Sequence, residues 1–127
     1  MAEGAEPSLY TRLGGYDAIA AATDDLLRRL TSDPQLGIYW RGHSTDSMQR
    51  DRQLVVDFLC AAFGGPVIYR GRDMKTSHAG LRISDSDWQV FVQHTLATLD
   101  TLGVQGKERE EFLAAAASLR GDIVERP

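Results

Sequence analysis

Tyr69-Arg-Gly-Arg-Asp-Met-Lys-Thr-Ser-His-Ala-Gly80 is a weakly helical stretch between two strongly helical parts of this 127-residue chain. Gly71 and Gly80 bracket it. Any helical turn inside it places Met74 and His78 on one face, because these residues are four positions apart. A lone histidine is more often a surface or core side chain than a metal ligand. The elements on either side therefore decide how His78 is interpreted.

Upstream of this stretch the hydrophobic pattern is helical. Ser8 can cap a short helix that stops at Gly14-Gly15, a pair that is costly inside a helix. Apolar residues at three- and four-residue spacing then predict a longer helix over 16–32. Asp33-Pro34 ends that helix and can start a short turn of helix leading to 38–40.

A further helix is predicted over 46–62, after a polar loop at 41–46. Gly64-Gly65-Pro66 terminates it. Apart from one aspartate, the side chains predicted on or near one face of this helix are apolar and offer no acid–base machinery. These residues are Met48, Asp51, Leu54, Val55, Phe58, Leu59 and Ala62.

Downstream, Ser84 followed by Asp87 resembles a capping box and predicts a helix that stops at Gly103. A final helix is predicted over 106–124. Strand-like alternation is almost absent, so the sequence predicts an all-α domain over 8–127 behind a flexible tail at 1–7.

Composition favours a single globular domain, with 43% hydrophobic residues, 25% charged residues and a net charge of −4. A run of about 18 apolar residues is missing, which argues against a membrane span. The acidic start of the chain is unlike a secretory signal, and the single cysteine, Cys60, fits a reducing cytoplasm. Without a stripe of lysine and arginine, nucleic-acid binding is disfavoured.

One imidazole opposite an apolar helix is poorly suited to hydrolysis. It suits a flat apolar cofactor with anionic edges, held by a single imidazole–metal bond, and that description matches haem with a proximal histidine. Arg72 and Lys75 lie near His78 in sequence and could meet the anionic edges. A zinc site is disfavoured, because His43 and His94 lie far from His78 in sequence and a second thiolate is lacking.

The chain resembles the truncated haemoglobins, and group I in particular, over residues 9–124. The motifs that carry this resemblance occur in the family's order. They are Leu9-Tyr-Thr-Arg-Leu-Gly-Gly15, Asp33-Pro-Gln-Leu36 leading to Tyr39-Trp40, Phe63-Gly-Gly-Pro66, Tyr69-Arg-Gly71 and Met74-Lys-x-x-His78-x-Gly80.

The resemblance implies a two-over-two helical sandwich, with haem b between the helix at 46–62 and the segment ending at His78. His78 would then be the proximal iron ligand, neutral and oriented by a nearby carbonyl or hydroxyl. Arg72 or Lys75 could pair with a haem propionate. The haem-contacting positions implied in this way are Trp40, Val55, Leu59, Tyr69, Arg72, Met74, Lys75 and Phe91.

On the opposite, distal side the chain departs from the family. The family's usual distal tyrosine aligns with Leu27, and the loop within 41–47 looks longer than usual. Counting back from Gly64-Gly65-Pro66 makes Asp51, Leu54, Val55 and Leu59 the inward positions, and an ionised Asp51 can only accept hydrogen bonds. A donor could still come from His43, Arg52 or Gln53. His43 could also reach the iron as a sixth ligand, or be an exposed loop residue.

The function implied is reversible binding of a diatomic gas (dioxygen, nitric oxide or carbon monoxide) at haem iron. Nitric oxide dioxygenation with an unidentified reductase is the activity implied by some relatives, although Leu27 argues against it. The alternatives are a haem-based gas or redox sensor acting through a partner protein, and a cofactor-free helical interaction module. The colour of the purified protein separates the last of these from the others.

Overall fold

The computed structural model describes residues 6–127. Within these residues the named elements are all helical, which confirms the predicted fold class. They are α1 (Leu9–Leu13), α2 (Tyr16–Ser32), the 3-10 helix η1 (Gly37–Trp40), α3 (Thr45–Ala62), α4 (Met74–His78), α5 (Asp85–Thr101), α6 (Gly106–Ala117) and α7 (Arg120–Ile123).

Several of the predicted helix starts and stops hold in the structure. The Ser8 side chain accepts a hydrogen bond from the Thr11 backbone N–H, and Gly14 ends α1 with a φ of 113°. Ser84 and Asp87 form the predicted capping box at the start of α5. Of the predicted tail, residues 1–5 lie outside the described part of the chain, while Glu6 forms an ion pair with Lys107.

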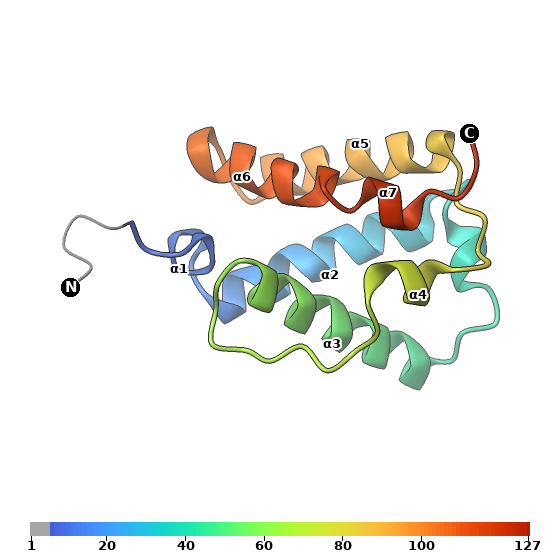
Figure 1. Cartoon of the computed structure of the whole chain (residues 1–127), viewed down its shortest axis with the longest axis horizontal. Coiled ribbons are helices and arrows are strands. Elements are labelled where there is room, and N and C mark those ends of the chain that lie inside the picture. Colours follow the sequence, from blue (N-terminus) through green and yellow to red (C-terminus); the bar gives the residue numbers. More distant parts are fainter. Residues whose placement is uncertain (1–5) are drawn as a thin grey trace.

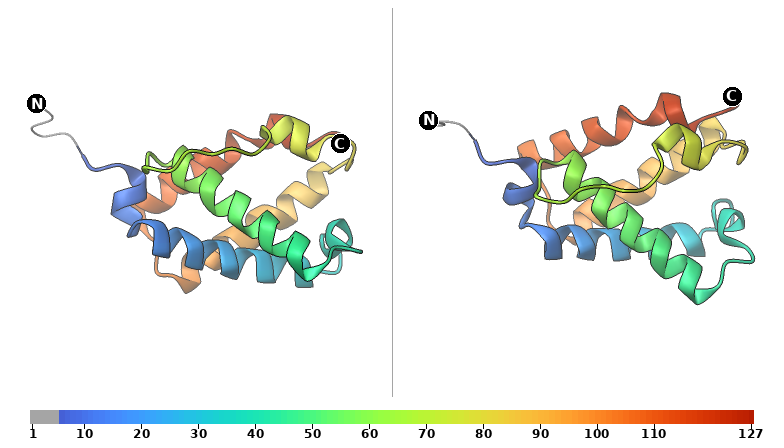
Figure 2. Two further views of the ribbon diagram at one scale, coloured as in Figure 1. Left: turned by 90° about the horizontal axis from the view of Figure 1, so that it is seen from below. Right: turned by 60° about the horizontal axis from the view of Figure 1, so that its bottom comes forward.

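Two long helices, α2 and α3, pack against each other, and α2 also packs against α5. Figure 1 shows α5 and α6 in the upper half of the molecule, above α2 and α3. Both views in Figure 2 place the short α4 beside α7, near the C-terminus. This arrangement brings His78 at the end of α4 close to the last residues of the chain.

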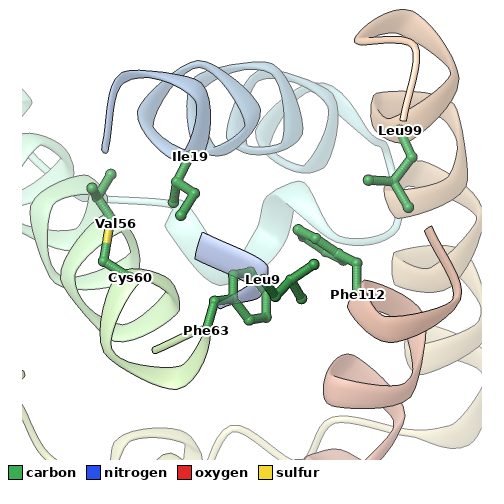
Figure 3. Packing of buried hydrophobic residues seen from close by; sticks show 7 residues of the cluster. All are labelled: Leu9, Ile19, Val56, Cys60, Phe63, Leu99 and Phe112. Atoms are coloured by element: carbon green, nitrogen blue, oxygen red, sulfur yellow. The ribbon is translucent and has the colours of Figure 1, made fainter. Parts of the chain in front are cut away.

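The buried apolar side chains form two separate clusters. The first apolar cluster joins α1, α2, α3, α5 and α6, and its members point toward one another in Figure 3: Leu9, Ile19, Val56, Cys60, Phe63, Leu99 and Phe112. The second apolar cluster is built on Leu26, Leu30 and Leu36. Its partly buried neighbours are Leu27, Tyr39, Trp40, Val90 and Phe91.

The face of α3 that enters the core is not the one predicted to face a cofactor. Val56 and Cys60 are fully buried in the first apolar cluster, whereas Val55 and Leu59 are half-buried and Leu54 is 42% exposed. The apolar residues of α3 cover a wider arc than the core needs. The apolar positions expected to face a cofactor are therefore largely those that the core does not use.

The weakly helical stretch that ends near His78 contains one short helix of five residues, α4, and a longer predicted helix is divided in two. The predicted helix over 106–124 is two helices, α6 and α7, interrupted at 118–119. There the Ser118 hydroxyl donates to the Ala115 carbonyl at 2.6 Å, and this competition with the backbone disturbs the helical ladder.

Across residues 6–127, no helix combines the length and the apolar character needed to cross a membrane.

Candidate functional site

His78 is held by the backbone of its own short helix. Asp73 caps the start of α4 by accepting from the Thr76 backbone N–H at 3.2 Å. At the other end, Nδ1 of His78 lies 2.8 Å from the Met74 carbonyl oxygen and 2.9 Å from the Ser77 hydroxyl. A carbonyl only accepts, so the proton is on Nδ1 and the lone pair is on Nε2. A half-buried imidazole in this tautomer is prepared to bind a metal ion through Nε2.

Several apolar side chains on α3 and just after α4 are left partly uncovered by the fold. Val55 and Leu59 present half-buried apolar side chains from α3, and Leu54 on the same helix is 42% exposed. Leu81, three residues after His78, is 43% exposed. These side chains are too apolar to favour water, and the residues present match the haem that the resemblance implies.

Further predicted site positions lie against the second apolar cluster. Trp40 at the end of η1 and Phe91 on α5 are half-buried against this cluster, and so is Leu27 on α2. The Phe91 ring lies 5.0 Å from that of Trp88. The structure thus brings three of the predicted site positions together from three elements.

Tyr69 shapes the loop that leads to α4. Its ring packs edge-to-face on Phe58 with centroids 5.3 Å apart, and its hydroxyl donates to the Arg72 carbonyl at 2.5 Å. Burial raises the pKa of this phenol. Because its hydroxyl is engaged by the backbone, Tyr69 contributes its apolar ring to the site rather than an acid.

Arg72 and Lys75 flank the start of α4 and are exposed, and neither forms an ion pair with the described residues 6–127. Within these residues, no carboxylate therefore competes with a haem propionate for either side chain. Met74 is half-buried between them and contributes its carbonyl to His78.

Of the three distal donors considered from the sequence, two have other partners. Arg52 forms a two-point contact with the Asp24 carboxylate on α2, and Gln53 donates to Tyr16 and Asp57. Both side chains are thereby engaged elsewhere than at the predicted gas site. His43 remains as the predicted distal donor.

His43 lies beside Asp51, with Nδ1 of the imidazole 3.3 Å from Oδ2 of the carboxylate. Both side chains are partly exposed, at 34% and 41%. The loop that precedes α3 thus places an imidazole over the first turns of that helix, where Asp51 can orient it. An ionised Asp51 can accept a hydrogen bond from His43, but it has no proton to donate to a bound gas.

Asp87 is the residue of this region whose wider role the sequence did not indicate. Its buried carboxylate accepts from the Gln35 amide at 2.6 Å, the Tyr39 hydroxyl at 2.6 Å and the Ser84 backbone N–H at 3.0 Å. These bonds outweigh burial and lower the pKa of Asp87 from 3.8 to about 2. The carboxylate fastens η1, and with it Trp40, to the start of α5.

The chain matches the family model described as bacterial-like globin over residues 8–125. It is 33% identical over 120 residues to a group 1 truncated hemoglobin of Mycolicibacterium paratuberculosis, covering 94% of this chain and 86% of that protein. It is 32% identical over 123 residues to another from Chlamydomonas moewusii, covering 94% of this chain and 70% of that protein.

Solved structures agree with this fold. Truncated hemoglobin from Tetrahymena pyriformis in the Fe(III) form superposes with a TM-score of 0.84 at 24% identity, covering 93% of this chain and 98% of that one. The 2/2 hemoglobin from a Synechococcus species gives a TM-score of 0.83 at 23% identity, with the same coverage.

Proposed function

This chain belongs to the bacterial-like globins and is a truncated haemoglobin, and from that premise we propose that it holds haem b and binds diatomic gases reversibly. The observation that carries the proposal is the Nδ1 contact of His78 with the Met74 carbonyl, which leaves Nε2 available for iron. When bound, haem supplies the iron at which a gas ligand binds.

The residues also support haem held without a thioether link. Cys60 is the single cysteine of the chain and is fully buried in the first apolar cluster. Its thiol is enclosed by the side chains of that cluster. Arg72 and Lys75 are available for the two propionates, and Val55, Leu59, Trp40 and Phe91 supply apolar contacts to the ring.

Titration of the haem-free protein with haemin tests the proposal. We expect one haem per chain, an intense blue-region absorption band, and carbon monoxide binding after reduction. A cofactor-free interaction module would give a titration no different from haemin added to buffer, and that result would reject the proposal.

We further propose that His43 is the donor that stabilises bound dioxygen. Leu27, Leu54 and Val55 carry no hydrogen-bond donor, and Arg52 and Gln53 are already engaged. The carboxylate of Asp51 would hold Nδ1–H of His43 and fix the direction of the other nitrogen. Bound dioxygen carries partial negative charge, so a donor there slows its release.

The His43→Ala variant is expected to release dioxygen roughly tenfold faster, since one hydrogen bond of about 1–2 kcal/mol is lost. Stopped-flow dissociation measurements check this. Adding Leu27→Tyr to the variant supplies a donor from α2 and should slow release again. If His43→Ala leaves the dissociation rate unchanged, His43 is an exposed loop residue and nothing more.

Nitric oxide dioxygenation is the second candidate function. The net reaction, NO + O₂ + e⁻ → NO₃⁻, consumes one electron per turnover and so needs a reductase. Residues 64–82 carry Arg70, Arg72, Lys75 and Arg82 against the single acid Asp73, although the whole chain has a net charge of −4. This local positive charge favours an acidic reductase as the partner. The single cysteine of the chain fits a cytoplasmic location for both proteins.

Mixing the dioxygen-bound protein with nitric oxide and measuring nitrate distinguishes nitric oxide dioxygenation from reversible gas binding. One nitrate per haem supports dioxygenation. If nitric oxide displaces dioxygen and no nitrate forms, the function is reversible gas binding. Such binding could also serve a gas sensor that signals through a partner protein.

A further inference from the structure

The last residues of the chain fold back on the segment that follows His78. The two carboxylate oxygens of Glu125 accept from two backbone donors, the Gly80 N–H at 3.1 Å and the Arg82 N–H at 2.7 Å. The Glu125 N–H in turn donates to the Ile83 carbonyl at 2.8 Å. Glu125 therefore makes three hydrogen bonds to three residues within positions 80–83.

The backbone held by Glu125 has an unusual conformation. Gly80 has a φ of 85°, and Arg82 has a φ of 58°, the only positive value of a non-glycine residue in the described part of the chain. Such a conformation persists only where the surroundings hold it. The Leu81 N–H also donates to the His78 carbonyl at 3.2 Å, so the unusual segment is directly coupled to the end of α4.

Arg126 completes the attachment. Its Nε donates to the Arg82 carbonyl at 2.7 Å, and its own carbonyl accepts from the Asp85 N–H at 3.1 Å. Arg126 also forms an isolated parallel bridge with Ser84. Figures 1 and 2 show the resulting arrangement, with α7 and the C-terminal residues beside α4.

We propose that Glu125 is a positioning residue for His78, which sets the place of the imidazole by fixing the backbone that follows it. This inference rests on the proposed function, because it assigns His78 to iron. The hydrogen bonds of the Glu125 carboxylate go to backbone N–H groups and not to the histidine ring. Each carboxylate oxygen accepts from a different N–H, whereas an amide of the same size has one acceptor oxygen and turns N–H donors toward the other position.

The direction of the Glu125 pKa agrees with this role. The N–H groups of Gly80 and Arg82 lower it, so the carboxylate is ionised and able to accept both bonds at neutral pH.

Glu125→Gln is the informative change, because the amide keeps the size but turns one acceptor into a donor that faces an N–H. The matched control is Glu111→Gln, which removes a carboxylate paired with Arg12 near α1, at the opposite end of the molecule from α4. Backbone hydrogen exchange is measured on the haem-free proteins. Haem loss to a haem-scavenging globin and the iron–histidine stretching band are measured on the reduced, haem-loaded ones.

In Glu125→Gln we expect exchange at residues 80–82 to quicken tenfold or more, haem loss to quicken at least threefold, and the iron–histidine band to shift or broaden. Glu111→Gln should leave all three as in the wild type. Normal exchange at 80–82 would overturn the proposal, and so would fast exchange with an unchanged band and unchanged haem loss. If the wild type itself fails to take up haem, the proposed function is rejected instead. That test is made on the wild type before the variants are compared.

Discussion

His78→Ala is expected to lose nearly all of its haem during purification, the largest effect of any single substitution in this chain. The imidazole is the predicted iron ligand, and its Nδ1 is already held by the Met74 carbonyl. Altering groups that only orient a ligand typically costs about 10–100-fold in metal affinity, and removing the ligand itself costs more. The ratio of haem absorption to protein absorption measures the loss.

His94→Ala is the matched control. Its Nε2 lies 2.7 Å from the Asp33 carboxylate, and the side chain is half-buried between α5 and the end of α2. Losing it costs some stability but should leave the haem content unchanged. A His78→Gly variant that recovers haem when imidazole is added would complete the assignment. If His78→Ala retained a normal haem spectrum, the iron ligand would have to be sought elsewhere.

Asp87→Asn is expected to lower the free energy of unfolding at neutral pH by about 2 kcal/mol, since a pKa difference of one unit corresponds to about 1.4 kcal/mol. The pKa of Asp87 is about 2 in the folded protein against an ordinary 3.8. The ionised form is therefore the one that the fold stabilises. That contribution is complete above pH 4 and disappears as the pH falls from about 4 toward 2.

Urea unfolding of wild type and Asp87→Asn, from pH 7 down to pH 3, measures this difference. The two proteins should differ most at neutral pH and converge in acid. Asp100→Asn is the control on the same helix, because the Asp100 side chain is 70% exposed and ion pairs at the surface contribute little. A difference between wild type and Asp87→Asn that stayed constant down to pH 3 would contradict the assignment of the low pKa to Asp87.

The helix plan of this protein could be predicted because its signals are local. The cap formed by Ser8, the capping box at Ser84 and Asp87, and the stop at Gly103 each involve residues within one turn of each other. The prediction of His78 as iron ligand combined a motif of seven residues with the order of the elements on either side of it. The break between α6 and α7 was not predicted. There the Ser118 hydroxyl donates to the Ala115 carbonyl at the end of α6.

The distal side could not be predicted, because it depends on which partner each polar side chain finds. Arg52 and Gln53 were equal candidates with His43 until the packing of α3 on α2 placed them beside Asp24 and Tyr16. Which residues of α3 enter the core was left open by the sequence for a similar reason. Periodicity identifies an apolar arc, but which part of that arc enters the core depends on the angle at which neighbouring helices cross.

The sequence by itself determined most of the helical elements, several of their ends and the histidine expected to bind iron, since these depend on short motifs and on their order along the chain. Only the tertiary structure decided what surrounds that histidine. Asp87 reaches Gln35 and Tyr39 across about 50 positions of sequence, and Glu125 reaches Gly80 and Arg82 across more than 40. Such pairings exist only after the helices pack, because no short-range pattern records which distant N–H or hydroxyl a carboxylate will meet.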